Sequence, residues 1–557
     1  MTSEAMVAVL WETISRMKIL IADKLAPEGA QYLESLPGIE VWTQIGLAGI
    51  ELADVLREHD GVVIRSAVQI TADVLNQCAA GGQSKLKAIA RAGVGVDNID
   101  LPTATSMGIA VMNSASASTI TTAEHAFALM IALARNIAPA HIAIAGGGWD
   151  RSKFTGIQLH GKTLGIVGMG RIGTTLAQRA LAFGMKVIGH DPFINATSTL
   201  DDQVPLLQSF QEMLSQVDVV SFHVPKTDVT TKMLDSKAFD AVKPGGILVI
   251  NAARGGIVDE EDLLEALESG KCIGAALDVF ENEPPPENSP LRNHPKILTT
   301  PHLGASTVEA QEAVAVGACK ALATYLRGEG MIGAVNAGGL VLDLSDRQQA
   351  FVDLSGQMIA LLHAAIGEEP LGSVKVTVRG EALAGAADTI ARFALAQLLS
   401  QHLDEPVNVI NAGLIAEQRH IDLQTIIASD QGEDRLAIEL KGTGYFIHKV
   451  QGAIYEDGLP RITHLDGYAM DMVPSGNMVL LTNKDVPGRI GMVGQLFGNA
   501  KMNIAEMVIG RKLDTDTNQS IAMMILKLET APPENLLEQL RKSPGILRVA
   551  SVALSGN

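Results

Sequence analysis

Short apolar runs alternate with helix-like stretches along the first three hundred residues. In residues 17–115 the runs are separated by segments in which apolar positions recur with helical spacing. This alternation predicts an α/β unit with a doubly wound sheet of its own. The expected strands are Lys18–Ala22, Ile39–Trp42, Gly61–Ile64, Leu86–Ile89 and Ile109–Met112.

A second α/β unit begins near residue 160, after a long helical stretch. Residues 117–145 are expected to form that stretch as one helix, with Arg135 near its middle. The strands expected after it are Leu164–Val167, Lys186–Ile188, Val217–Phe222, Gly246–Ile250, Ile273–Leu277 and Ile297–Thr299.

The pattern changes after Gly328, and residues 336–476 are expected to form a third globular unit. Its predicted elements are helices at Gln348–Ile366 and Asp388–Leu399, a strand at Ser373–Val378, and hairpin strands at Ala437–Leu440 and His448–Gln451.

Residues 477–557 read strand, helix, strand, strand, helix, strand, which is the ferredoxin-like order. The expected elements are Met478–Thr482, Gly488–Asn499, Asn503–Lys512, Gln519–Leu528, Glu534–Lys542 and Ile546–Val552.

Composition narrows the class of protein. A chain of 557 residues predicts three or four domains, and 47% apolar against 4% aromatic residues predicts aliphatic cores. A formal charge of -19 argues against a nucleic-acid or anionic-membrane partner. The cysteines are far apart and lack disulfide or metal-site spacing, so we expect a reducing cytoplasm and no bound metal. They are Cys78, Cys272 and Cys319.

The first sixteen residues stand apart from these units. They lack the basic region of a signal peptide, and Met17 directly precedes a strand-like run. We interpret residues 1–16 as a disordered extension or as sequence upstream of a start at Met17, which N-terminal sequencing of the native protein would distinguish. No apolar run reaches the roughly 18 residues of a membrane span.

The stretch TLGIVGMGRIG, residues 163–173, has the spacing GxGxxG between a strand-like run and a helical pattern. Gly168 permits a tight turn, Gly170 lets a pyrophosphate approach the backbone, and Gly173 lets the helix pack closely. The helix N-terminus offers free N–H groups to phosphates. At the end of the next strand, Asp191 can accept hydrogen bonds from ribose hydroxyls and would repel a 2′-phosphate. This combination favours an NAD site over an ordinary strand–turn–helix corner.

Polar residues follow three later strands of the same unit, in the loops 251–256, 278–284 and 301–307. Arg254 can hold a carboxylate with two hydrogen bonds, and His302 can carry a proton to or from a hydroxyl. A carboxylate on the other imidazole nitrogen would orient the ring. Each residue alone is more often structural, but together on successive strand ends they predict a hydride-transfer site.

Other candidate ligands follow strand ends of the first unit. Arg65 with Ser66, and Gly93 with Val94, lie where open α/β sheets bind ligands. The alternative for Arg65 is a solvated surface charge. Arg135, in the long helical stretch, is either a snorkelling side chain or an anion ligand.

Four motifs together resemble the D-isomer-specific 2-hydroxyacid dehydrogenases: VGMGRIG, NAARGGIVDE, ALDVFENEP and PHLGAST. With RSA at 65–67, RAGVGVDNID at 91–100 and the two C-terminal units, the chain is similar to the long D-3-phosphoglycerate dehydrogenases of that family from about residue 17 to its end.

This resemblance implies an α/β architecture of four domains. A split flavodoxin-like substrate-binding domain would cover residues 17–115 and 305–335, with a Rossmann NAD-binding domain inserted at 116–304. An α+β intervening domain would follow at 336–476 and a ferredoxin-like ACT regulatory domain at 477–557.

The resemblance also implies residue roles. His302 would be the acid/base, Glu283 its partner and Arg254 the ligand of the substrate carboxylate. The implied NAD contacts are Val94, Gly168, Gly170, Arg171, Ile172, Gly173, Asp191, Pro225, Ala252, Ala253, Arg254, Asp278, His302, Gly304 and Ala305. The implied substrate contacts are Arg65, Ser66, Gly93 and Arg135. Val94 stands where relatives often have Thr, which removes a hydroxyl contact near the nicotinamide.

The ferredoxin-like unit carries a candidate effector site. The turn at 483–488 can bind a small zwitterion through Asp485 and the helix N-terminus, or it is only a tight turn. The resemblance implies Asp485 and Asn503 as contacts for L-serine. It also places Trp149 at a subunit contact and implies a homodimer or homotetramer.

The implied reaction is the NAD-dependent oxidation of 3-phospho-D-glycerate to 3-phosphohydroxypyruvate, the first step of the phosphorylated route to L-serine. One alternative is another D-2-hydroxyacid dehydrogenase, such as a glyoxylate or hydroxypyruvate reductase, which the tail beyond residue 336 argues against. The other is a non-catalytic NAD-sensing protein, which the intact Arg254, Glu283 and His302 argue against.

Overall fold

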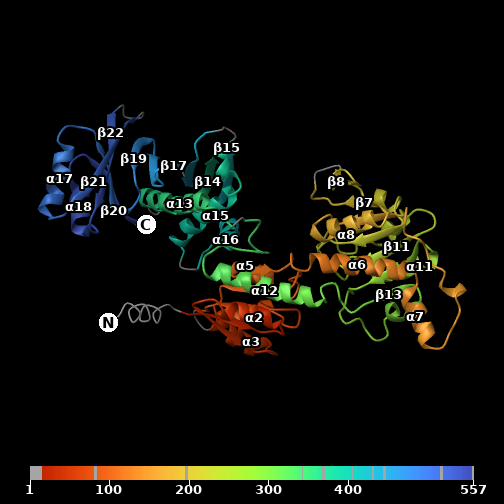
Figure 1. The fold of residues 1–557 in the computed structure, drawn as a ribbon. Helices are drawn as coiled ribbons and strands as arrows, with labels where there is room; N and C mark the ends of the chain where they lie inside the picture. Colours follow the sequence, from red (N-terminus) through yellow and green to blue (C-terminus); the bar gives the residue numbers. More distant parts are fainter. Residues whose placement is uncertain are drawn as a thin grey trace.

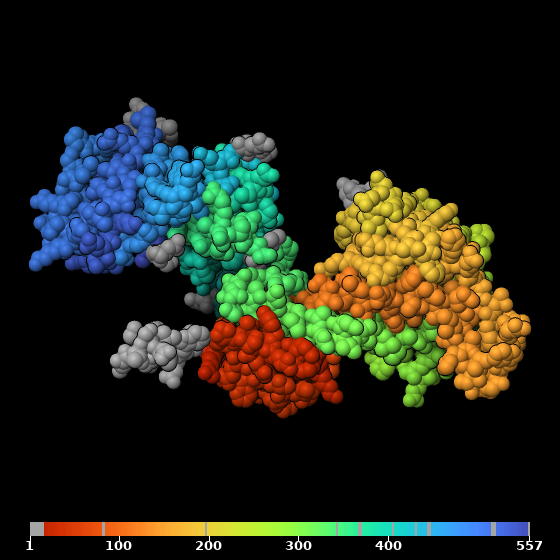
Figure 2. Space-filling view, viewed as in Figure 1, coloured from red at the N-terminus to blue at the C-terminus, as the bar shows by residue number. Residues whose placement is uncertain are grey.

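The computed structural model describes residues 16–80, 84–194, 198–340, 343–366, 370–403, 406–428, 432–442, 447–514 and 519–554. Nearly all of the N-terminal extension expected at residues 1–16 lies outside this description. The second α/β unit, drawn in orange to yellow-green, lies at one end of the molecule, and the C-terminal unit, in blue, lies at the other (Figure 1). In the space-filling view the second unit is a separate lobe, joined to the rest through orange and green segments (Figure 2).

The first unit is a five-stranded parallel sheet in the order β2-β1-β3-β4-β5, which is the flavodoxin-like order. Helix α12 (Val308–Leu326) returns from the second unit to pack on α2 and on this sheet, so the unit is built from two separate stretches of chain. The other elements are β1 (Met17–Ile21), α2 (Pro27–Glu34), β2 (Ile39–Thr43), α3 (Gly49–Arg57), β3 (Gly61–Ile64), α4 (Ala72–Ala79), β4 (Ala88–Arg91), α5 (Leu101–Ser106) and β5 (Ala110–Asn113).

The second unit is a six-stranded parallel sheet in the order β13-β12-β11-β10-β6-β7. Apolar clusters cover both of its faces, as expected for a parallel sheet enclosed by helices. Its strands are β6 (Thr163–Val167), β7 (Lys186–His190), β10 (Val219–Phe222), β11 (Ile247–Asn251), β12 (Cys272–Leu277) and β13 (Ile297–Thr299), with the small pair β8 (Ser198–Thr199) and β9 (Val204–Pro205). Its helices are α6 (Thr119–Ala134), α7 (Ile137–Ala145), α8 (Arg171–Ala182), α9 (Phe210–Leu214), α10 (Ser236–Asp240), α11 (Glu260–Ser269) and the 3-10 turns η1 (Ser152–Phe154) and η2 (Pro290–Asn293).

The single helix expected over residues 117–145 is wrong. Helix α6 ends at Ala134 and α7 starts at Ile137 after a bend of 64°. The cause is Asn136, whose φ of 51° is left-handed, a conformation that asparagine tolerates better than most residues.

Among the described residues no single helix has both the length and the apolarity to cross a membrane; only α6 and α7 taken together as a bent pair meet that test.

The third unit confirms the predicted helices and hairpin and adds strands that the sequence pattern did not reveal. Strands β16 and β17 pair antiparallel as predicted, within a six-stranded sheet in the order β15-β14-β16-β17-β18-β19. The elements are α13 (Asp346–Ile366), β14 (Leu371–Arg379), α14 (Glu381–Ala384), α15 (Ala387–Ser400), α16 (Ala412–Gln418), β15 (Asp422–Ala428), β16 (Arg435–Gly442), β17 (Ile447–Ile454), β18 (Pro460–Leu465) and β19 (Tyr468–Met472).

The fourth unit has the predicted ferredoxin-like order, with strands arranged β21-β22-β20-β23. Helices α17 and α18 cover one face of this sheet, while α13 and β19 of the third unit contact its other side. The elements are β20 (Gly476–Lys484), α17 (Arg489–Asn499), β21 (Ile504–Asp514), β22 (Gln519–Leu528), α18 (Glu534–Lys542) and β23 (Ile546–Leu554). One continuous apolar core joins the first unit, the third unit and this sheet.

Candidate active site

The strand order of the second unit places the predicted site loops side by side. Because the strands are parallel, the loops after β13, β12 and β11 leave the sheet at one edge, carrying His302, Glu283 and Arg254 respectively. At about 4.8 Å between strands, these three loops start within about 10 Å of one another. The glycine-rich loop after β6 and Asp191 after β7 occupy the other half of the same edge.

His302 and Glu283 form a hydrogen-bonded pair. Imidazole Nδ1 of His302 lies 2.7 Å from carboxylate Oε2 of Glu283, and the histidine side chain is half exposed. Oxygen Oε1 of Glu283 accepts a hydrogen bond from the Phe280 amide at 3.1 Å. Burial raises the pKa of the Glu283 carboxyl, but the hydrogen bond and charge of His302 outweigh it and leave that pKa lowered. The pair therefore presents the other ring nitrogen, Nε2, as a proton acceptor.

Asp278 holds the His302 loop in place. Its backbone carbonyl accepts the His302 amide at 2.9 Å, and its carboxylate accepts the amides of Leu303 at 2.7 Å and Gly304 at 2.9 Å. His302 has a left-handed φ of 54°, which only a few per cent of residues other than glycine adopt. The hydrogen bonds of Asp278 on either side of that residue stabilise this conformation.

Two side chains complete the environment of Asp278. Thr300 donates its hydroxyl to the carboxylate at 2.6 Å, and His125 of α6 places Nε2 at 3.1 Å from it. Burial raises the pKa of Asp278, but these hydrogen bonds and that of Leu303 outweigh it, so the pKa is lowered. The carboxylate is fully buried and bonded within the protein, so the structure assigns it a positioning role, and its contact with nicotinamide stays a prediction.

The three glycines of the GxGxxG loop serve three different purposes. Gly168 has a φ of 92°, and a Cβ there would lie 2.6 Å from the His223 carbonyl oxygen. A Cβ on Gly173 would lie 2.0 Å from the Gly168 carbonyl oxygen, so α8 can approach the loop only with glycine. A Cβ on Gly170 would meet no described atom within 4 Å, which leaves open space in front of the α8 N-terminus.

Asp191 is fixed against this loop. Its carboxylate accepts the amides of Met169 at 2.9 Å and of Phe193 at 3.0 Å. The free space at Gly170, the uncapped N-terminus of α8 and this carboxylate together fit the pyrophosphate and ribose of NAD.

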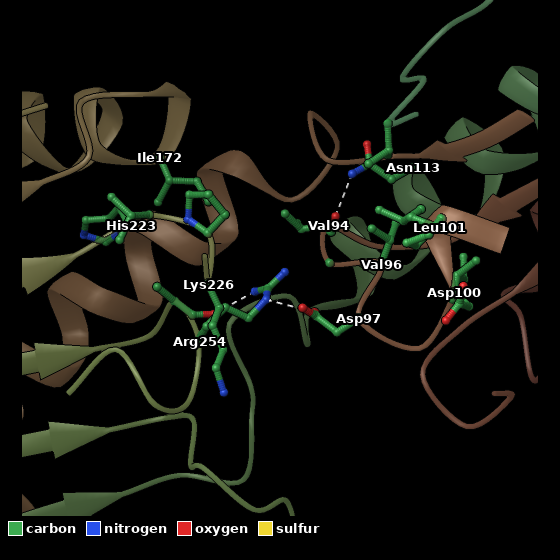
Figure 3. Close-up of a pocket in the computed structure, with 17 residues that line it drawn as sticks. Val94, Val96, Asp97, Asp100, Leu101, Asn113, Ile172, His223, Lys226 and Arg254 are labelled. Carbon is green, nitrogen blue, oxygen red and sulfur yellow. Dashed lines mark hydrogen bonds and ion pairs between the residues drawn. The ribbon is translucent and has the colours of Figure 1, made fainter. Parts of the chain in front are cut away.

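A cavity of about 610 Å³ separates the first two units (Figure 3). Predicted cofactor contacts Ile172, Pro225 and Ala253 line one wall, and Val94 lines the other. Arg254 reaches across it: Nε donates to Asp97 Oδ2 at 3.2 Å, and Nη1 donates to the Ala253 carbonyl at 2.7 Å. The site is therefore a cleft between the carboxyl edges of two parallel sheets.

Arg91 is a site residue that the sequence pattern missed. It donates Nη2 to Ser66 Oγ at 3.2 Å, while its buried Nε has no hydrogen-bond partner among the described residues. Burial and the neighbouring charge of Arg254 lower its pKa to about 10, and Arg65 adds to the effect. The expected strand stopped at Ile89, whereas β4 runs to Arg91 and carries it to the sheet edge.

The predicted substrate contacts Arg65 and Gly93, like Ser66, are already engaged within the first unit. Arg65 donates Nη1 to the Lys24 carbonyl at 3.3 Å. The Gly93 amide donates to Ser114 Oγ at 3.0 Å, so it is not free for a ligand. A Cβ on Gly93 would lie 1.9 Å from Arg91 Nη1, which means that the glycine makes room for that guanidinium.

Arg135 is not brought to this site within one chain, contrary to its predicted role. Helix α6 begins beside the His302 loop, where the hydroxyls of Thr121 and Thr307 are 3.4 Å apart. Its 16 residues extend about 24 Å at 1.5 Å each, and Arg135 caps the far end as an exposed side chain.

The two predicted effector residues are also separated within one chain. Asp485 follows β20 and pairs with Arg511 at 3.4 Å and Ser520 at 3.1 Å, beside a cavity of about 320 Å³. Asn503 precedes β21 and donates to Glu529 at 2.8 Å. Asn503 is eight residues before Arg511 along β21, so about 26 Å of strand at 3.3 Å per residue separates it from the Asp485 turn.

Comparisons with known proteins agree with this geometry. Residues 127–304 match the D-isomer specific 2-hydroxyacid dehydrogenase NAD binding domain, and residues 347–466 match the D-3-phosphoglycerate dehydrogenase intervening domain. The chain is 37% identical over 541 residues to the D-3-phosphoglycerate dehydrogenase of Methanocaldococcus jannaschii, covering 97% of this chain and 100% of that one. It is 36% identical over 538 residues to that of Bacillus subtilis, covering 96% and 99%.

Solved structures resemble the first two units. The TT0316 protein from Thermus thermophilus has a TM-score of 0.51 and 35% identity, covering 57% of this chain and 100% of that one. A glyoxylate reductase from Paecilomyes thermophila has a TM-score of 0.52 and 31% identity, covering 58% and 98%.

Proposed function

Because the chain belongs to the D-3-phosphoglycerate dehydrogenase family, we propose that it oxidises 3-phospho-D-glycerate to 3-phosphohydroxypyruvate with NAD as the acceptor. The observation that carries the chemistry is the His302–Glu283 pair, 2.7 Å apart on the edge that also holds the dinucleotide loop. This reaction is the first step of the phosphorylated route to L-serine.

The proposed mechanism uses the chain for proton transfer and orientation, and NAD accepts the hydride that leaves C2 of the substrate. Neutral His302 takes the C2 hydroxyl proton on Nε2, since Nδ1 is bonded to Glu283. The ionised Glu283 stabilises the imidazolium that forms. Asp278 keeps His302 at the sheet edge throughout, because it accepts hydrogen bonds from the backbone amides of His302, Leu303 and Gly304.

We propose that the arginines around the cleft hold the two anionic ends of the substrate. Burial and the charges of Arg254 and Arg65 lower the pKa of Arg91 against the opposing charges of Asp97 and Asp23, so both arginines repel Arg91. A carboxylate and a phosphate would relieve that repulsion, and Arg254 can exchange exposed Asp97 for the carboxylate. A local positive cluster thus attracts an anion to a protein of net charge -19.

Substrate choice is tested by initial rates of NADH formation with 3-phospho-D-glycerate, D-glycerate and D-lactate. We expect the phosphorylated substrate to have the highest kcat/KM, by about 100-fold over D-glycerate, because lost charge-assisted hydrogen bonds are worth about 1.5–3 kcal/mol each. Comparable rates with D-glycerate or preference for glyoxylate reduction would instead support the other D-2-hydroxyacid dehydrogenases. The same assay with NADP checks Asp191, which should disfavour the 2′-phosphate.

We further propose a homodimer formed through α7. This helix has no buried side chain in the single chain, and Ile142 is 70% exposed and nearby Trp149 81% exposed. Large exposed apolar side chains gathered in one segment are typical of a contact surface.

L-serine stays a proposed effector at the turn around Asp485. A second copy of the fourth unit would be needed to bring an Asn503 near that turn, because one chain keeps the two apart. Rates measured with added L-serine, in wild type and in Asp485→Ala, would test this site. We also place the protein in the cytoplasm, which its three buried, unpaired cysteines support.

A further inference from the structure

The short helix α5 connects the active-site cleft with the third unit. Its capping residue Asp100 and its first residues, Leu101 and Pro102, line the cavity between the first two units. Just before them in the chain, Asp97 lines the same wall and holds Arg254 at 3.2 Å (Figure 3). The start of α5 is therefore part of the substrate-side wall of the cleft.

Two asparagines of the third unit hold the other end of α5. Asn408 donates Nδ2 to the Gly108 carbonyl at 2.8 Å, and Asn411 donates Nδ2 to the Ser106 carbonyl at 3.4 Å. Gly108 has a φ of 70°, and a Cβ there would lie 2.6 Å from Asn408 Nδ2. Figure 1 shows α16, which follows Asn411, next to α5. The close approach of the two units at this point thus requires glycine.

The two asparagines are themselves rigid. Asn411 Oδ1 accepts the Asn408 amide at 2.8 Å, and Asn408 Oδ1 accepts the Ile410 amide at 2.9 Å. Asn411 is 1% exposed and also donates to the Pro406 carbonyl at 2.9 Å. Because both amide groups are bonded at their oxygen and nitrogen ends, a shift of the third unit moves the donors that hold α5.

A third asparagine fixes the same turn from the connection between the units. Asn336 Oδ1 accepts the Val111 amide at 2.8 Å, and its Nδ2 donates to Thr105 Oγ1 at 3.0 Å and to the Ile109 carbonyl at 2.9 Å. Its neighbour Val335 lines the cleft. The end of α5 is thus tied both to the connection and to the third unit.

Packing beside these bonds is incomplete. A cavity of about 1170 Å³ opens between the first and third units, with Met107 and Gly108 on one side and Phe393 and Asn408 on the other. The shared apolar core therefore joins the two units beyond this cavity, and the asparagine hydrogen bonds make the contact at α5 itself.

We propose that Asn408 and Asn411 are positioning residues for the reaction, which fix α5 and through it the substrate-side wall of the cleft. A movement of the third unit then changes substrate affinity through α5, a rigid element about 9 Å long. The effect on substrate affinity rests on the proposed function, whereas the coupling of the third unit to the cleft wall through α5 does not.

The test compares full-length Asn408→Ala and Asn408→Asp with Gln397→Ala, which alters the same cavity without touching α5. Hydrogen–deuterium exchange should rise about fivefold within residues 94–108 in both Asn408 variants, as expected for the loss of about 1 kcal/mol, and not in the control. The KM for 3-phospho-D-glycerate should rise by a similar factor, with kcat and NAD affinity unchanged.

Unchanged exchange in residues 94–108 would overturn the proposal, and so would a uniform rise along the whole chain or a loss of kcat at constant KM. Asn408→Asp keeps the shape of the side chain, so it still tests whether the Asn408 hydrogen bond holds α5 if the alanine variant folds poorly. If the protein does not oxidise 3-phospho-D-glycerate, the proposed function fails while the exchange result still decides the coupling.

Discussion

At the scale of single residues, the site depends on how His302 is held. Its ring is bonded to Glu283 and its left-handed backbone to Asp278, so the histidine has little freedom before substrate arrives. Strand-like runs in the sequence predicted an arginine, a carboxylate and a histidine at this edge, and the family resemblance singled out Glu283 as the carboxylate. The role of Asp278 could not, because hydrogen bonds to backbone amides leave no trace in a residue pattern.

The charge of Glu283 is expected to matter for turnover more than for binding. Glu283→Gln keeps a hydrogen bond to Nδ1 but cannot stabilise the imidazolium, so kcat should fall about 100-fold, within the usual range for acid–base catalysis. NAD affinity, measured by fluorescence titration, should be unchanged. Glu287→Gln, an exposed substitution in the same loop, is the matched control. A kcat within twofold of wild type would remove Glu283 from the mechanism.

Asp278 should make a pH-dependent contribution to stability. Its pKa is lowered in the folded protein, so its contribution is complete above the ordinary carboxyl pKa of about 3.9 and is lost as the pH falls below it. Asp278→Asn should lower the free energy of unfolding by about 2 kcal/mol at pH 7, and the difference from wild type should shrink below about pH 4.

Urea unfolding across pH measures this difference, with exposed Asp228→Asn as the control. An equal loss at pH 3 and pH 7 would show that the ionised form of Asp278 is not what stabilises the loop.

At the scale of elements, the strands and helices around the cofactor edge follow the sequence pattern closely. Apolar runs of the second unit correspond to β6, β7 and β10–β13, and Gly168 and Gly173 stand where the loop geometry requires glycine. The sequence pattern placed element ends wrongly where a single residue sets the backbone conformation or extends a strand. Asn136 ends a helix whose apolar periodicity continues, and β4 extends to the charged Arg91, which an apolar run does not include.

The glycine loop makes a pair of contrasting predictions. Gly173→Ala places a methyl group 2.0 Å from a backbone oxygen, so α8 must shift, and both Tm and NAD affinity should fall. Gly170→Ala meets no described atom, so Tm should stay the same while NAD affinity falls at least about tenfold through collision with the pyrophosphate. Calorimetry and NAD titration separate the two, and a Gly170→Ala variant with normal NAD affinity would place the pyrophosphate elsewhere.

At the scale of the whole molecule, the first unit and the two C-terminal units share one apolar core. A single apolar core runs from the first unit through the third to the sheet of the fourth, while the second unit has cores of its own. The second unit is therefore the part that shares no apolar core with the rest of the molecule. The sequence indicated the four units but not this connection, because long-range packing is not visible in local periodicity.

The assembly is expected to depend on α7. Ile142→Asp places a charge in the exposed apolar surface, so a homodimer formed there should dissociate in sedimentation velocity with little change in Tm. Ile50→Asp, at a residue of α3 that is 67% exposed, is the matched control and should leave the assembly unchanged. A dimer that survives Ile142→Asp would place the subunit contact on another surface.

Hydride transfer from C2 of a phosphorylated D-2-hydroxy acid to NAD is expected to depend on His302 and the cleft arginines. The most direct measurement uses 3-phospho-D-glycerate carrying deuterium at C2, with mass spectrometry of the nicotinamide product. We predict one deuterium per NADH formed and no detectable transfer with His302→Ala, which should still bind NAD. NADH without deuterium would rule out hydride transfer from C2, and transfer at the wild-type rate in His302→Ala would remove His302 from the reaction.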